Sequence, residues 1–180
     1  MNTIIHKADI RGNANHGWLN SRHTFSFGNY DNPERMNFGV LCVLNDDRVQ
    51  AGMGFETHPH DNMKIISIPL EGDLEHNDSM GNVAVIKEGD VQVMSAGTGI
   101  THSEYNKNKD KEVKFLQTWV FHREKSVTPR YDQISIRDIE KNNEFYQVLS
   151  PNKDDQDLWV NQDAWFNLGK FTKGNTDQYK

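Results

Sequence analysis

The chain has 180 residues, a net charge of −6 and a mean hydropathy of −0.81. Its length fits one generous domain or one domain with an appendage, and its acidic balance argues against direct binding to nucleic acid or to an anionic membrane. The single cysteine, Cys42, excludes an intrachain disulfide. We find neither a secretory leader nor an apolar run of membrane-spanning length, so we expect a cytoplasmic protein.

Strand signals dominate the first three quarters of the chain. Residues 38–44 form an almost continuous apolar run, which predicts a strand buried on both faces. Further short apolar or β-branched runs, bounded by turn-forming residues, lie at 63–70, 83–86, 91–94 and 115–121. Short strands at this regular spacing predict an all-β sandwich or barrel.

The character of the chain changes near residue 140. Residues 136–141 predict at most a turn or two of helix, and the last apolar stretch is 164–168. We therefore divide the chain into a metal-binding domain over 1–140 and a C-terminal arm over 141–180. Exposed strand edges in such an arm invite aggregation unless they are covered. We expect the arm to dock on its own barrel or on a second subunit, which would make a homo-oligomer.

Two polar pairs some forty residues apart carry the chemistry: His58-Pro59-His60 and His102-Ser103-Glu104. On a strand, residues i and i+2 share one face, so each pair can direct two side chains to one point. Three imidazoles and a carboxylate suit a borderline transition metal such as Fe(II), Mn(II), Ni(II) or Zn(II). Proline is tolerated only at special strand positions, which argues against two idle surface histidines around Pro59. The pattern predicts a metal site.

Dense motifs extend from residue 6 to residue 137. They are Gly17-Trp18-Leu19, residues 21–27, Gly54-Phe55 with His58-Pro59-His60, Leu70-Glu71-Gly72, residues 78–82, residues 89–92 and residues 94–104. With these motifs the sequence resembles the pirin family of the cupin superfamily, and especially its bacterial members with quercetin 2,3-dioxygenase activity. The resemblance implies a cupin barrel, also called a double-stranded β-helix or jelly roll. It also implies that residues 141–180 resemble the start of a second, incomplete cupin lobe.

The resemblance implies one bound divalent metal, held by His58, His60, His102 and Glu104. Fe(II) is the first choice, with Mn, Ni, Zn or Cu as alternatives. The implied activity is that of a metal-dependent dioxygenase acting on a small aromatic substrate, a flavonol such as quercetin or a similar polyphenol. The alternatives are a metal-binding, redox-sensing regulator that acts through protein partners and a catalytically silent, shortened pirin. We expect no catalytic residue beyond the metal ligands.

One departure from the general cupin pattern concerns Lys64, which stands where that pattern has a glutamate after the histidine pair. Strand parity after His60 predicts that Lys64 points toward the cavity, unless the turn at Asp61-Asn62 resets the phase. In the cavity it would modulate catalysis without preventing metal binding.

Other side chains near the motif are assigned more simply. Phe55 and Met63 flank the metal motif and are candidates for an apolar, substrate-binding wall. We expect the other aromatic residues of the N-terminal region to belong to the core, namely Trp18, Phe25, Phe27 and Tyr30. A structural or surface role is expected for the remaining histidines, which are His6, His16, His23, His76 and His122.

Overall fold

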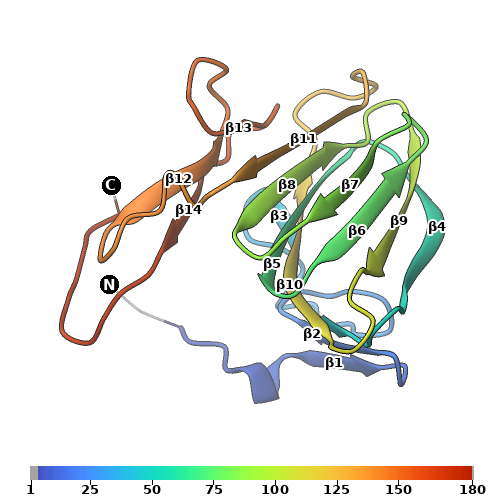
Figure 1. The fold of residues 1–180 in the computed structure, drawn as a ribbon, viewed down its shortest axis with the longest axis horizontal. Helices are drawn as coiled ribbons and strands as arrows, with labels where there is room; N and C mark the ends of the chain where they lie inside the picture. Colours follow the sequence, from blue (N-terminus) through green and yellow to red (C-terminus); the bar gives the residue numbers. More distant parts are fainter. Residues whose placement is uncertain (1–3, 180) are drawn as a thin grey trace.

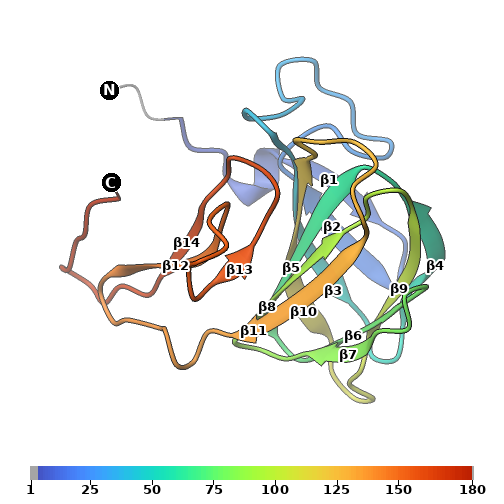
Figure 2. The same cartoon turned by 90° about the horizontal axis from the view of Figure 1, so that it is seen from above.

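A computed structural model describes residues 4–179. Residues 1–3 of the predicted metal-binding domain and residue 180 of the predicted arm lie outside the described residues. Two facing sheets form a barrel (Figure 1, Figure 2). The larger sheet has the order β1 (Gly12–Asn15), β2 (Leu19–His23), β3 (Leu41–Val49), β10 (Val113–Phe121), β5 (Met63–Glu71), β8 (Asp90–Ser95) and β11 (Arg130–Ser135). The smaller sheet has the order β4 (Gly54–His60), β9 (Ile100–Asn106), β6 (Leu74–Asp78) and β7 (Val83–Ile86).

The predicted all-β barrel is confirmed. Within the described residues the only helix is η1 (Ala8–Ile10), a single 3₁₀ turn, and no helix there is long and apolar enough to cross a membrane. All strand pairs of the two barrel sheets are antiparallel. Such sheets are expected to alternate between a face toward the interior and a face toward the outside.

A row of polar side chains crosses the inner face of the large sheet. His23 pairs with Asn45, Asn45 with Gln117, and Gln117 with Ser67. Directly opposed residues of an antiparallel pair lie on the same face, so all four side chains face the barrel interior. Each is at most 7 % exposed. The interior is therefore polar at this level, which places the candidate site there.

The outer face of the large sheet is covered by the arm. Residues 141–179 form a small sheet of β13 (Leu158–Trp159), β12 (Phe145–Ser150) and β14 (Phe166–Gly169), which lies beside the barrel in both views (Figures 1 and 2). Val148 and Leu149 of β12 share one apolar cluster with Ile66 of β5 and Val93 of β8. Of the two expected docking modes, the structure shows the arm on its own barrel.

Candidate metal centre

The two histidine-bearing segments are neighbouring strands. β4 lies at the edge of the small sheet and pairs with β9, so that His58 opposes His102 and Phe55 opposes Glu104. Between these two pairs, β4 has two residues, Glu56 and Thr57, where β9 has only Ser103, which is a β-bulge. The extra residue resets the alternation of β4, so Phe55, His58 and His60 all face the same side as His102 and Glu104.

Local sequence features explain this geometry. Pro59 lies in an edge strand, where a missing backbone donor is tolerated. A Cβ atom at Gly54 would lie 2.3 Å from the carbonyl oxygen of Glu104, so only glycine lets β4 approach β9 this closely. Gly97 and Gly99 before β9 have φ of +50° and +134°, as expected for glycines that turn the chain sharply into that strand.

The imidazoles of His58, His60 and His102 converge. Their ligand nitrogens lie within 4.8 Å of one another, and the His58 and His102 ring centroids are 4.5 Å apart. Glu104 belongs to a second, overlapping group with His102 and His76, which meets the same 4.8 Å criterion. The four predicted ligands thus fall into two overlapping groups that share His102.

The state of these side chains fits a divalent metal. The Nε2 atoms of His60 and His102 are buried without a hydrogen-bond partner, which is costly unless a ligand uses their lone pairs. Burial and the neighbouring rings lower the pKa of His60 to about 4 and that of His102 to about 3, so both rings are neutral near pH 7. His58 Nδ1 lies 2.7 Å from the carbonyl oxygen of Glu56, to which it donates, leaving Nε2 free to bind an ion.

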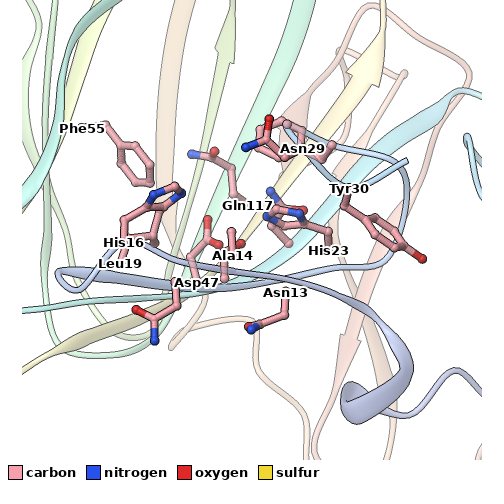
Figure 3. Close-up of a pocket in the computed structure, with 15 residues that line it drawn as sticks. Asn13, Ala14, His16, Leu19, His23, Asn29, Tyr30, Asp47, Phe55 and Gln117 are labelled. Atoms are coloured by element: carbon pink, nitrogen blue, oxygen red, sulfur yellow. The ribbon is translucent and has the colours of Figure 1, made fainter. Parts of the chain in front are cut away.

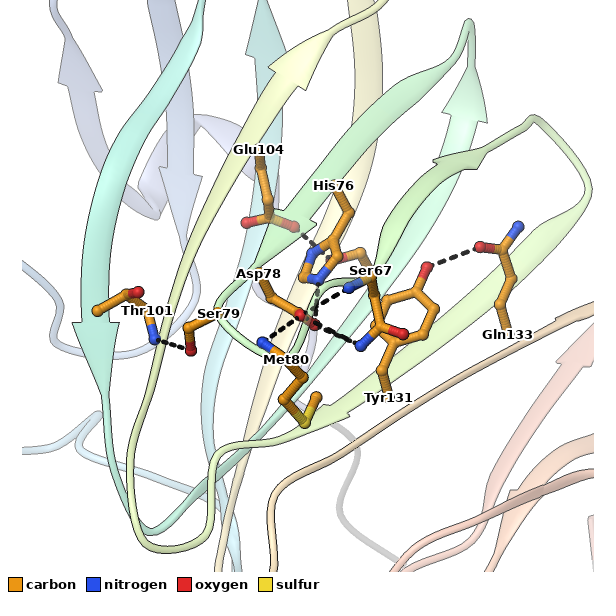
Figure 4. Close-up of polar contacts among 10 residues, drawn as sticks. Ser67, His76, Asp78, Ser79, Met80, Thr101, Glu104, Tyr131 and Gln133 are labelled. Carbon is orange, nitrogen blue, oxygen red and sulfur yellow. Dashed lines mark hydrogen bonds and ion pairs between the residues drawn. The ribbon is translucent and has the colours of Figure 1, made fainter.

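Glu104 is held in place by the polar row of the large sheet. Its Oε1 accepts a hydrogen bond from Ser67 Oγ at 2.9 Å, and its Oε2 accepts one from Gln117 Nε2 at 2.6 Å (Figure 4 shows Ser67 and Glu104). A carboxylate oxygen has a second lone pair, so both bonds leave Glu104 able to bind a cation. Neither Ser67 nor Gln117 was identified from the sequence, because their approach depends on the packing of the two sheets.

His58, His60 and Glu104 line a pocket of about 500 Å³, here called the metal pocket. Its walls are largely aromatic, and they include Trp18, Phe27, Phe55 and Trp119. The expected wall role of Phe55 agrees with this placement. Trp18 and Phe27 were expected in the core; both line the pocket, and Trp18 also packs against an apolar core cluster. Met63 is not among the described lining residues; it packs beside Cys42, with the two sulfur atoms 4.0 Å apart.

Lys64 does not point toward this pocket. Asn62 has a φ of +45°, and this left-handed residue resets the phase between His60 and β5. Lys64 therefore lies on the outer face, where it is 2 % exposed and donates a hydrogen bond to Ser95 Oγ. Its surroundings include Trp159 of the arm. Simple strand parity is therefore wrong for Lys64, and the alternative considered from the sequence, a phase reset at Asp61-Asn62, agrees with the structure.

His76 is closer to the site than the sequence suggested. It opposes Glu104 across β6 and β9 and is fully buried. Its Nε2 lies 3.1 Å from Asp78 Oδ2, and its ring stacks on Tyr131 with centroids 4.7 Å apart (Figure 4). The available signal was the spacing of His76 and Asp78, a third i, i+2 pair on a strand beside β9.

Comparison with known protein families decides the identity of the fold. The model of the family described as Pirin matches residues 5–120, which is more than half of the chain. The chain belongs to the pirin family. A second model, described as Quercetinase C-terminal cupin domain, matches residues 147–180. The barrel is thus the expected cupin barrel.

Relatives of known name agree with this membership. The chain is 48% identical over 159 residues to the quercetin 2,3-dioxygenase of Escherichia coli K12, covering 88% of this chain and 68% of that one. It superposes on the bacterial pirin YhhW of Escherichia coli in complex with nickel(II), with a TM-score of 0.82, 48% identity and coverage of 87% and 66%. Protein YhaK of Escherichia coli has 26% identity, a TM-score of 0.65 and coverage of 87% and 67%.

The chain spans about two thirds of the length of these relatives. The nickel(II) complex is that of YhhW, and in this chain the histidine cluster is a group that could hold a metal ion.

Proposed function

We propose that the protein is a metal-dependent dioxygenase acting on a flavonol such as quercetin or a similar polyphenol. The observation that carries the proposal is the convergence of three imidazoles, two of which line an aromatic-walled pocket. Membership of a family with relatives named quercetin 2,3-dioxygenase supports the same substrate class.

In this proposal His58, His60, His102 and Glu104 hold one divalent transition metal, with Fe(II) as the first choice and Mn, Ni, Zn or Cu as alternatives. When bound, such an ion supplies Lewis acidity and, if redox-active, a means of reacting with dioxygen. The residues around it have simpler tasks. Ser67 and Gln117 fix the orientation of Glu104, and the Glu56 carbonyl fixes that of His58.

The pocket walls suit a flat aromatic substrate. Trp18, Phe27, Phe55 and Trp119 offer ring faces and edges for stacking and limit the entry of water. The indole Nε1 of Trp119 is buried without a partner, so it can donate a hydrogen bond to a substrate oxygen. His60 packs edge-on against the Trp119 ring at 4.9 Å, which keeps this donor beside the proposed metal ligands.

The proposal is tested by elemental analysis of the purified protein together with dioxygen uptake in the presence of a flavonol. We expect stoichiometric metal and substrate-dependent uptake in the wild type. His60→Ala should lose both, whereas His6→Ala, a histidine outside the cluster, should retain both. Full metal content in His60→Ala would reject the ligand assignment, and a metal-loaded protein without uptake on any polyphenol would reject the activity.

We also propose that residues 141–180 are the first part of a second cupin lobe. The match of residues 147–180 to a C-terminal cupin model and the folding of this segment as a separate small sheet support the assignment.

A further inference from the structure

A second cavity, of about 550 Å³, lies between the β1–β2 hairpin and the inner face of the large sheet (Figure 3). We call it the Asp47 cavity. Asp47 and Gln117 face the same space there, with Phe55 on one side and His23 and Tyr30 on the other. No function was assigned to this cavity from the sequence motifs, and the proposed metal site does not require it.

Its deep wall contains buried polar atoms without partners. Asp47 and Asn45 are each 2 % exposed and His23 is 4 % exposed. Asp47 Oδ1, Asn45 Oδ1, His23 Nδ1 and the Oγ of Ser21, which also lines the cavity, form no hydrogen bond. Buried polar groups are almost always paired, so four orphaned atoms lining one cavity indicate that a ligand or ordered water completes them.

Three of these orphaned atoms are hydrogen-bond acceptors, and the fourth is the Ser21 hydroxyl, which can donate or accept. Two are carboxylate and amide oxygens, and burial lowers the pKa of His23, so its ring is neutral near pH 7. A neutral imidazole has one donor and one acceptor nitrogen, so Nδ1, which is buried without a partner, can be the acceptor. The matching ligand must therefore bring several donors.

The carboxylate of Asp47 lacks a compensating cation. Within residues 4–179 no ion pair forms at Asp47. Burial raises its pKa to about 7; the Ser21 hydroxyl acts against this shift, although it makes no hydrogen bond of acceptable geometry. A hydrogen bond from a hydroxyl group strongly stabilises a buried carboxylate that has no cation beside it.

The Asp47 cavity adjoins the metal pocket. Phe27, Phe55 and Gln117 line both, and Gln117 also donates to Glu104. The two cavities therefore share an aromatic wall, with orphaned acceptors on one side and the converging histidines on the other. A flat polyphenol has this distribution, because its ring faces are apolar and its hydroxyl donors lie at its edge.

We propose that the Asp47 cavity is a subsite for the hydroxylated ring of the substrate, with Asp47 and Asn45 accepting hydrogen bonds from its hydroxyl groups. The inference rests on the proposed function, since it assumes an aromatic ligand in the adjoining metal pocket. It adds specificity: the site prefers flavonols that carry hydroxyl groups on the ring remote from the metal.

The test is equilibrium binding of two flavonols to metal-loaded protein without oxygen, followed by fluorescence. One ligand is quercetin, whose phenyl ring carries two hydroxyl groups, and the other is a flavonol with an unsubstituted phenyl ring. Asp47→Asn should weaken quercetin binding about tenfold, as for the loss of a hydrogen bond to a charged group. Binding of the unsubstituted flavonol should change less than about twofold, since it makes no such bond.

Asp46→Asn is the matched control, because Asp46 neighbours Asp47 in β3 but is not among the residues lining the cavity. It should leave both affinities unchanged. Asn45→Ala is a second variant and should show the same selective loss as Asp47→Asn, with folding of each variant checked by circular dichroism.

Equal losses for both flavonols, or no loss for quercetin, would overturn the subsite. So would a rise in melting temperature with Na⁺ or Ca²⁺ that Asp47→Asn abolishes, because the cavity would then be a cation site. Since binding is measured without turnover, selective binding by a protein that consumes no dioxygen would reject the proposed activity while supporting the subsite.

Discussion

Burial controls the ionisation of side chains inside the barrel. Removal from water disfavours the charged form, so it acts in opposite directions on bases and acids. The pKa of His60 and of His102 is lowered, whereas the pKa of Asp47 is raised. Near pH 7 the interior therefore contains neutral imidazoles that are ready to bind a cation and a carboxyl group close to its midpoint.

His60 and His102 should stay neutral in mild acid. In the metal-free protein we expect the His60 and His102 rings to titrate near pH 4 and pH 3, so protons compete with a metal for these rings only in that range. Because the unfolded chain binds these protons below about pH 6.5, the metal-free protein should lose stability as pH falls from there. NMR of the ring resonances measures both values; titration of either ring near pH 6.5 would contradict the burial argument.

Asp47 should make stability fall as pH rises. At about pH 3 both the folded and the unfolded carboxyl groups are largely protonated, whereas from there to pH 7 the unfolded group ionises first, so the folded state is penalised. Asp47→Asn removes this penalty. The variant should match the wild type at about pH 3 and exceed its unfolding free energy by on the order of 2–4 kcal/mol at pH 8. Urea titrations at the two pH values measure the difference, and a constant offset would rule out the raised pKa.

At the scale of strands, β5 joins two environments. Ser67 faces the interior and orients Glu104, whereas Ile66 and Lys64 face the arm. The left-handed Asn62 sets this phase. The side chain at position 64 therefore has no route to the proposed metal ligands, and a lysine there is compatible with metal binding.

Lys64 should limit stability rather than activity. Burial, and then the nearby Arg130, lower its pKa, so the charged form is disfavoured in the folded protein. Lys64→Met keeps a long side chain without the charge. We expect a gain of about 1–2 kcal/mol in unfolding free energy, with metal content unchanged. A loss of metal or of dioxygen uptake in this variant would show that position 64 acts on the site after all.

At the scale of the whole molecule, the barrel and the arm share one apolar core. Val148, Leu149 and Leu158 of the arm pack against Ile66 and Val93 of the barrel, and all are at most 3 % exposed. This contact covers the outer face of the large sheet, which would otherwise expose a contiguous apolar patch. The arm therefore contributes to the stability of the metal-binding domain without contacting the metal pocket.

Leu149→Ala should destabilise the protein by about 2–5 kcal/mol, because it leaves a cavity in the shared core. Leu70→Ala is the matched control, since Leu70 is 51 % exposed, and it should cost less than about 1 kcal/mol. Thermal unfolding followed by circular dichroism compares the two. Metal content per folded molecule should be the same in both variants. A small effect of Leu149→Ala would mean that the arm is not packed on the barrel in solution.

Much of the fold and the core of the candidate site were predicted from the sequence, because they depend on local periodicity. Short apolar runs between turn residues indicate strands, and i, i+2 spacing places His58 with His60 and His102 with Glu104 whatever the rest of the chain does. The same local rule explains why the barrel class and the four candidate ligands could be predicted without knowing the order of the strands.

Other features depended on strand register and on single backbone angles, which local patterns do not determine. The β-bulge in β4 aligns Phe55 with the histidines, and the φ of Asn62 turns Lys64 away from them. Pairing between distant strands brings Gln117 to Glu104 and creates the buried acceptors around Asp47. The sequence alone determined which side chains could bind a metal. Only the tertiary structure decided which residues surround them, because those contacts join strands far apart in the chain.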